Sequence, residues 1–386
     1  MQRAKHQRAY RVTWATWTCV AAAAALLTAC GGGGSGDGND PGKVTTVKVV
    51  GDSLADSGTF GYKFTVQSAQ AAGAGSTPLW VDQVATRYST SLCAHYRYNG
   101  ANFAVQADCG NYAVGGGRIN YPQSPKSPIS IPQQLHDAAA QGYGKGDLVL
   151  VDGGGNDASD LVGAYLAAAV DHGASYQALL ATQLDATTVQ SLLGAGATGL
   201  AEAGITYMQA LAKGWATTIR SNTVSQGAPR VVVLNMPDIS QTPKFRVVLQ
   251  AVAAQQGAAA AQQLQALIAN WVRAFNQQLA SSLAGDGRVV IVDFYTELNN
   301  QIAQPQKYGY TNVTTPACPI VGADGQGLPT YDLSTCTAAS LSANIPAGQS
   351  ATWWQSYVFA DGFHPTPRGH AQLGIAVVSS LAQAGW

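Results

Sequence analysis

The chain has 386 residues, of which 21 are basic and 21 acidic, so its formal net charge is zero. Charged residues make up 11% of the chain, against roughly 25% in an average soluble domain. Nucleic-acid binding rests on many Lys and Arg contacts to phosphate, and this balance offers no excess of basic residues for it. The 46% of apolar residues argues against extensive disorder and is ample for a buried core.

Residues 1–29 have the pattern of an export signal. Residues 1–11 contain four basic residues and no acidic one, and an apolar run over residues 12–27 follows. This run is shorter than the ~20 residues of a membrane-spanning helix. A basic start, an apolar run and small residues at its end predict a secretory signal peptide. Without residues 1–29 the chain has 17 basic and 21 acidic residues, and its formal charge is −4.

The signal ends in LTAC at residues 27–30, which resembles the bacterial lipobox, whose Cys carries lipid and begins the mature chain. We therefore expect Cys30 to be lipidated and residues 30–42, which are rich in Gly, to be a flexible tether. Gly31, rather than Asp, follows Cys30. By resemblance to Gram-negative sorting rules, this favours the outer membrane or cell surface, or release outside the cell. The alternative is an ordinary signal peptide with a chance Cys.

Four short apolar segments predict strands, and longer segments between them predict helices. The expected strands are Lys43–Val50, Asp147–Asp152, Arg230–Asn235 and Arg288–Phe294. The expected helices are Leu79–Tyr88, Ile131–Gln141, Leu161–Val170, Tyr176–Leu193, Gly204–Ser221, 246–284 with a break at Gly257, and Arg368–Ala384. This alternation predicts a parallel sheet covered by helices, in one domain over residues 43–386. In such sheets, sites form at the carboxyl ends of the strands.

Four cysteines remain beyond Cys30, and an even count in an exported chain suggests disulfides. The sequence-local pairing is Cys93–Cys109 and Cys318–Cys336, although three connectivities are possible. A four-Cys metal site is the alternative, but no C-x2-C pair is present.

The polar clusters that follow the strands contain the residue types needed for acyl transfer. This chemistry requires a nucleophile, a base, a group that orients the base, and donors for an oxyanion. Ser53 follows the first strand and Asn156, in GGND, follows the second. In DGFHP, the spacing lets Asp361 accept the Nδ1–H of His364, which leaves Nε2 free to take the Ser53 proton. Each motif alone is also common in ordinary turns.

The order GDSL, NYAVGGG, GGND and DGFHP resembles the four diagnostic blocks of the GDSL lipases, also called SGNH hydrolases. The wider spelling, such as GDSLADSGT and VVVLNMPDISQTP, resembles the lecithinase/hemolysin-like and plant-type branch, over about residues 47–380. The resemblance implies an α/β fold, a three-layer α/β/α sandwich with a mainly parallel, roughly five-stranded sheet. It implies no metal and no cofactor.

The resemblance also implies site residues. Ser53, His364 and Asp361 match the family's triad, and the oxyanion donors would be the Ser53 N–H, the Gly116 N–H and the Asn156 side chain. Gly117 departs from the pattern, because relatives often have Ala after the second Gly.

The leading functional hypothesis is a secreted, lipid-anchored serine esterase or lipase that hydrolyses acyl esters through an acyl-enzyme. The alternatives are a phospholipase or acyltransferase, or a polysaccharide O-acetyl esterase. A hypothesis of a different class is a non-catalytic surface-binding lipoprotein. The aromatic residues before Asp361 fit an acyl pocket, a sugar platform or ordinary core packing; they are Trp353, Trp354, Tyr357 and Phe359. The sequence does not predict an oligomeric state or an acyl-chain length.

Overall fold

The computed structural model describes residues 43–67 and 77–386. The predicted signal peptide, the predicted lipidation site at Cys30 and the predicted tether lie outside these described residues. Within them, no helix combines the length and the apolar character needed to span a membrane.

A parallel four-stranded sheet forms the centre of the fold, in the order β1-β4-β5-β6. Its strands are β1 (Thr46–Val50), β4 (Asp147–Val151), β5 (Val231–Leu234) and β6 (Val289–Val292). All four lie within the segments that the sequence predicts as strands. The register pairs Val50 with Val151 and Val151 with Val233, so that β1, β4 and β5 end level with one another.

The fifth strand that the family resemblance implies is present only as an extended segment at the edge of β1. Val49 donates to Gly110 O at 2.9 Å, and its own carbonyl accepts from Tyr112 N at 2.8 Å. Val114 N then donates to Gly51 O at 3.2 Å. Residues 110–114 thus run parallel to β1 and lead directly into three consecutive glycines, residues 115–117, which we call the glycine loop. The pairing of this segment with β1 is too irregular to count as a full strand.

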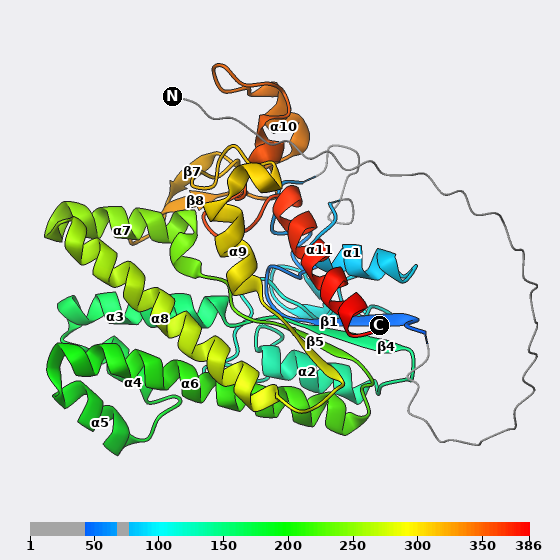
Figure 1. The fold of residues 1–386 in the computed structure, drawn as a ribbon, viewed down its shortest axis with the longest axis horizontal. Coiled ribbons are helices and arrows are strands. Elements are labelled where there is room, and N and C mark those ends of the chain that lie inside the picture. The colour runs from blue at the N-terminus through cyan, green and yellow to red at the C-terminus, as the bar shows by residue number, and fades with distance from the viewer. Residues whose placement is uncertain (1–42, 68–76) are drawn as a thin grey trace, which may run out of the picture. The chain divides into compact units, whose positions relative to one another are not determined.

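Both faces of the sheet are covered by helices because every second strand residue points to the opposite face. Val149 and Val151 pack with α2 (Ile131–Ala140), α6 (Gly196–Asn222) and α8 (Ala258–Leu283). Leu148 and Leu150 pack with α1 (Trp80–Arg87), α9 (Phe294–Ala303) and α11 (Pro367–Gln383). Figure 1 shows α1 and α11 on one side of β1 and β4, with α2 and α6 on the other. The predicted three-layer α/β/α arrangement is confirmed.

Several helix boundaries differ from the prediction. The helix expected at 161–170 is α3 (Gly155–Asp171), so GGND begins a helix rather than a free turn. The helix expected at 176–193 is two helices, α4 (Ala174–Leu180) and α5 (Ala186–Gly194), because Asp185 caps α5 by accepting from Thr188 N. The break at Gly257 is confirmed: this residue has φ 90° and separates α7 (Pro243–Gln256) from α8.

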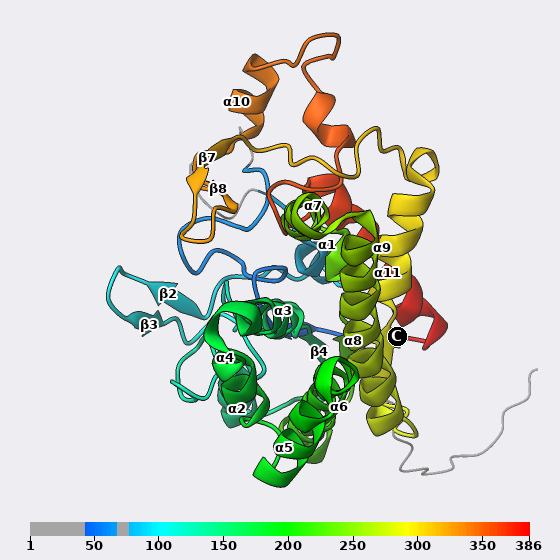
Figure 2. The ribbon, with the colours of Figure 1, turned by 90° about the vertical axis from the view of Figure 1, so that its left-hand side faces the viewer.

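Two loop-rich regions, residues 89–130 and 305–358, contain small elements that the sequence does not indicate. The first holds the hairpin of β2 (Tyr96–Tyr98) and β3 (Phe103–Val105), which projects away from the central sheet (Figure 2). The second holds β7 (Ile320–Ala323), β8 (Pro329–Tyr331) and α10 (Ala338–Ala343). Short 3-10 helices complete the described chain, at Val224–Gln226, Ile239–Gln241, Pro305–Tyr308 and Trp353–Ser356.

Each loop-rich region contains one disulfide, with the sequence-local pairing Cys93–Cys109 and Cys318–Cys336. Because both sulfurs of each pair are used, the four-Cys metal site is excluded. Bridges across 16 and 18 residues each stabilise a fold by about 3 kcal/mol in the chain-entropy account. Trp353, Trp354 and Tyr357 are buried against the second bridge, so they are core residues rather than an open sugar platform.

Candidate active site

Ser53 lies in a tightly held turn directly after β1. Gly51 N donates to the Gln134 side chain and Asp52 N to Asp152 Oδ1, both at 2.8 Å. Asp52 then accepts from Leu54 N through its side chain and from Ala55 N through its carbonyl. Ser53 is 5% exposed, and its own N–H has no hydrogen-bond acceptor among the described residues. The turn therefore fixes the backbone on both sides of Ser53 while leaving its N–H available.

Ser53, His364 and Asp361 form a continuous hydrogen-bonded chain across 311 residues of sequence. The Ser53 Oγ lies 2.7 Å from His364 Nε2, and His364 Nδ1 lies 2.8 Å from Asp361 Oδ2. The other carboxylate oxygen, Asp361 Oδ1, accepts from the backbone N–H of Phe363 and of His364, both at 2.7 Å. The turn that precedes α11 thus holds the Asp361 carboxylate against His364 Nδ1, as the D-x-x-H spacing predicts.

The contact between Asp361 and His364 shifts the pKa of each residue. Burial alone would raise the pKa of Asp361, but His364 and the two backbone donors lower it below its ordinary 3.8. Burial would lower the pKa of His364, but the charge and hydrogen bond of Asp361, helped by Asp52, raise it above 6.5. A raised pKa makes His364 a stronger acceptor for the Ser53 proton.

The glycine loop presents one free backbone donor, and it belongs to Gly116. Gly115 N donates to Asp56 Oδ2 at 2.8 Å, and Gly117 N donates to Val114 O at 2.9 Å. The N–H of Gly116 has no acceptor in the part of the chain that the structure describes. Its φ of 77° lies in the left-handed region, which glycine adopts without strain. Of the three glycines, the one selected by resemblance is thus the one with an available N–H.

Asn156 lies in the first turn of α3, which begins after Gly154 in the left-handed conformation (φ 102°). Its side-chain Nδ2 donates to Gly117 O at 2.9 Å, which ties α3 to the glycine loop. An amide nitrogen carries two hydrogens, so one remains available for a further acceptor. Free donors of Ser53, Gly116 and Asn156 therefore lie in the three segments that directly follow β1, residues 110–114 and β4.

Gly117 is required by the close approach of the glycine loop to the Ser53 turn. A Cβ at this position would lie 2.8 Å from Gly51 O, 3.0 Å from Val114 O and 3.1 Å from Asp52 Cα. All three are backbone atoms, which cannot rotate away as a side chain can. The structure thus gives a steric reason for Gly at position 117 of this chain.

We predict that Gly117→Ala lowers both stability and activity. The added methyl group must push the Ser53 turn away from the glycine loop, and overpacking of this kind costs about 1–3 kcal/mol. Denaturant unfolding and ester hydrolysis measure the two effects. The matched control is Gly214→Ala on the exposed side of α6, where nothing lies within 4 Å of the new Cβ. That change should raise helix stability slightly, and equal behaviour of the two variants would contradict the packing argument.

Two buried polar residues support the site and are not identified by the sequence motifs. Asp56 accepts from Gly58 N, Thr59 N and Gly115 N at 2.7–2.8 Å. Asn111 donates to Ala55 O and Ser57 Oγ, and it accepts from Ala113 N. The sequence feature that could have identified Asp56 and Asn111 is their position inside the blocks GDSLADSGT and NYAVGGG. Asp157, in GGND, likewise accepts from Ile119 N and Asn120 N, so it orders a loop.

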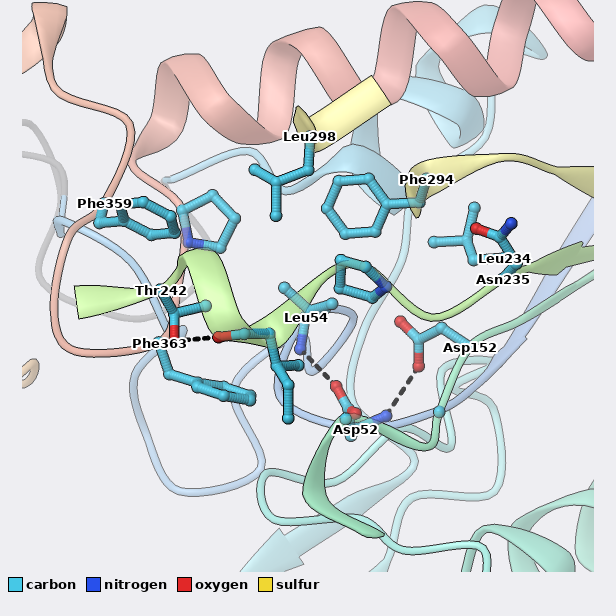
Figure 3. Close-up of a pocket in the computed structure, with 15 residues that line it drawn as sticks. Asp52, Leu54, Asp152, Leu234, Asn235, Thr242, Phe294, Leu298, Phe359 and Phe363 are labelled. Atoms are coloured by element: carbon cyan, nitrogen blue, oxygen red, sulfur yellow. Dashed lines mark hydrogen bonds between the residues drawn. The ribbon is translucent and has the colours of Figure 1, made fainter. Parts of the chain in front are cut away.

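An apolar pocket lies beside the Ser53 turn at the carboxyl ends of the strands (Figure 3). Its walls include residues adjacent to the site, such as Leu54, Phe363 and Pro365, together with Phe294, Leu298 and Phe359. Phe359 therefore lines this pocket, whereas Trp353 and Trp354 do not. The Asp52 and Asp152 carboxyl groups also line the pocket, and Asp152 Oδ2 has no partner in the described part of the chain. Burial and the neighbouring Asp52 charge raise the pKa of Asp152, which favours its neutral form.

Within residues 43–67 and 77–386, no three His, Cys, Asp or Glu side chains are grouped so as to hold a metal ion. The fold and the hydrogen-bonded chain define a parallel α/β protein with a Ser-His-Asp arrangement at the carboxyl edge of its sheet. The model of the GDSL-like lipase/acylhydrolase family matches residues 47–377, and the chain belongs to this family. No curated protein matches the chain. Its placement in the lecithinase/hemolysin-like or plant-type branch stays a prediction.

Proposed function

We propose that the protein is a serine esterase or lipase that hydrolyses carboxylic esters through an acyl-enzyme on Ser53. The observation that carries this proposal is the chain from Ser53 Oγ through His364 to Asp361, with contacts of 2.7 and 2.8 Å, next to two free backbone N–H groups. Membership of a family of ester hydrolases supports the same reaction. A non-catalytic binding protein would not require a hydrogen-bonded Ser, His and Asp next to free backbone N–H groups.

In the proposed mechanism, Ser53 Oγ attacks the ester carbonyl while its proton passes to His364 Nε2. The resulting oxyanion accepts hydrogen bonds from the N–H groups of Ser53 and Gly116 and from the second hydrogen of Asn156 Nδ2. When the tetrahedral intermediate collapses, the leaving alcohol takes the proton from His364. Water then attacks the acyl-enzyme with His364 again as base, and the acid is released.

Asp361 acts on His364 in two ways. Its Oδ2 accepts the Nδ1–H, which keeps the lone pair of Nε2 directed at Ser53, and its charge stabilises the imidazolium that forms during each proton transfer.

The test is hydrolysis of 4-nitrophenyl acetate and butyrate by the purified protein, together with labelling by a fluorophosphonate. We expect turnover of at least one ester, one label per chain at Ser53, and loss of turnover in proportion to labelling. Active protein that is labelled elsewhere would identify a different nucleophile. Protein that neither turns over the esters nor reacts would favour the non-catalytic alternative.

We further propose that the enzyme is exported and held at the outer membrane or cell surface by lipid on Cys30. The two disulfides support an oxidising compartment, and the LTAC motif supports the anchor. In expressing cells fed a labelled fatty acid, the wild-type chain should take up label and Cys30→Ala should not. Label in the variant would contradict this anchor.

A further inference from the structure

Lys244 is a partly buried cation beside the proposed active site, and no carboxylate of residues 43–67 or 77–386 pairs with it. It lies at the beginning of α7, where its backbone N–H donates to Gly362 O at 2.8 Å. Its ammonium group lies 5.9 Å from the ring centres of Phe245 and Phe363. Gly362 and Phe363 are the two residues between Asp361 and His364, so the stem of Lys244 packs directly on the turn that carries the base.

The Lys244 ammonium makes one hydrogen bond, to Ser159 Oγ at 3.0 Å. Ser159 follows Asn156 by three residues in α3, and residues so spaced on a helix lie about 5–6 Å apart at Cβ. The ammonium group is therefore hydrogen-bonded to the residue one helical turn beyond Asn156, the proposed oxyanion donor. Two of the three ammonium hydrogens remain without an acceptor among the described residues.

Two other cations near the site or in the core have a carboxylate partner. Arg118 makes a bidentate pair with Asp160 at 2.6 and 3.1 Å, and its remaining nitrogen donates to Gly116 O. The buried Lys63 pairs with Asp82 at 2.7 Å. For Lys244 no carboxylate lies within ion-pair distance in the described part of the chain. Removing a cation from water without such a partner is unfavourable, so its position needs another explanation.

We propose that Lys244 recognises an anionic group, a carboxylate or phosphate, on the ester substrate. This inference rests on the proposed esterase function and assigns the substrate class: esters that also carry a negatively charged group. With Asp361 paired to His364 and Asp160 paired to Arg118, neither carboxylate pairs with Lys244, and its charge is left for a ligand to complement. Burial lowers the pKa of Lys244 below its ordinary 10.5, and the charges of Asp160, Asp324 and Asp361, which lie more than 4 Å away, oppose this shift.

The test compares kcat/KM for matched esters with and without a carboxylate, in the wild-type protein and in Lys244→Met. One pair, phenyl acetate and 4-acetoxybenzoate, places the charge on the leaving alcohol. The other, 4-nitrophenyl butyrate and mono-4-nitrophenyl glutarate, places it on the acyl chain. In at least one pair, Lys244→Met should lower the ratio of anionic to neutral kcat/KM by about tenfold, the loss expected for a hydrogen bond to a charged group. The pair that responds identifies the side of the ester that carries the charge.

Three controls separate recognition from a structural role. Ser159→Ala removes the hydrogen bond but keeps the charge, so it should retain the anionic preference; a structural role predicts that it behaves like Lys244→Met. Lys244→Arg should restore part of the preference. Lys213→Met, on an exposed part of α6, controls for net charge. Turnover of all esters with an unchanged ratio in Lys244→Met would overturn this inference alone, whereas no turnover by the wild-type protein would overturn the proposed function and the inference with it.

Discussion

Replacement of Ser53 by Ala should lower kcat for ester hydrolysis by roughly 10⁶-fold, the loss seen when a serine hydrolase loses its nucleophile. The Oγ at 2.7 Å from His364 Nε2 is the atom that the proposed acyl-enzyme requires. Ser53 is 5% exposed and its Oγ supports no other hydrogen bond in the described chain, so the variant should fold normally. Steady-state assays with 4-nitrophenyl esters measure the change.

The matched control is Ser281→Ala, because Ser281 is an exposed serine on α8. It should keep wild-type kcat. Thermal unfolding of both variants separates a lost nucleophile from a lost fold. If Ser53→Ala retained wild-type turnover, the proposed mechanism would be wrong.

Replacement of Asp361 by Asn should lower kcat by about 10⁴-fold, as expected when an orienting carboxylate becomes an amide. Asp361 Oδ1 accepts two backbone N–H groups, so the amide oxygen of Asn would occupy that position. Its NH2 group would then face His364 Nδ1 and donate to it. The imidazole would carry its proton on Nε2, where it cannot accept one from Ser53.

The same variant should change the pH dependence of the residual activity. His364 must be neutral to act as a base, so kcat/KM of the wild-type protein should fall as pH drops through a pKa that lies above 6.5. Without the Asp361 charge, burial lowers the pKa of His364, and the acid limb should move to lower pH. Asp108→Asn, at an exposed position, should leave both kcat and the acid limb unchanged. An unshifted limb in Asp361→Asn would show that another group titrates there.

The four sequence motifs identify the family and contain the residues predicted for the centre of the site. They can do so because each motif works through residues that are close together in the sequence. The glycines before Asn156 permit the tight entry into α3, and the spacing of Asp361 and His364 lets one carboxylate bind both backbone and imidazole within a single turn. The apolar runs likewise predict all four strands, since strands buried on both faces need continuous Val and Leu. The boundaries of α3 to α6 are less well predicted, because Ala-rich segments favour helix on either side of a cap such as Asp185.

Contacts between distant segments are decided only by the tertiary structure. The requirement for Gly at 117 comes from the backbone at Gly51, and Gly116 is the available donor because Asp56 and Val114 engage its two neighbours. Nothing near Lys244 in the sequence marks it as part of the site, since its position depends on the packing of α7 against the His364 turn and α3. The sequence by itself determined the family and predicted the candidate catalytic residues, whose motifs are local. The tertiary structure decided which backbone donors stay free and which charge stays unpaired, because hydrogen bonds and ion pairs are completed by residues far apart in the chain.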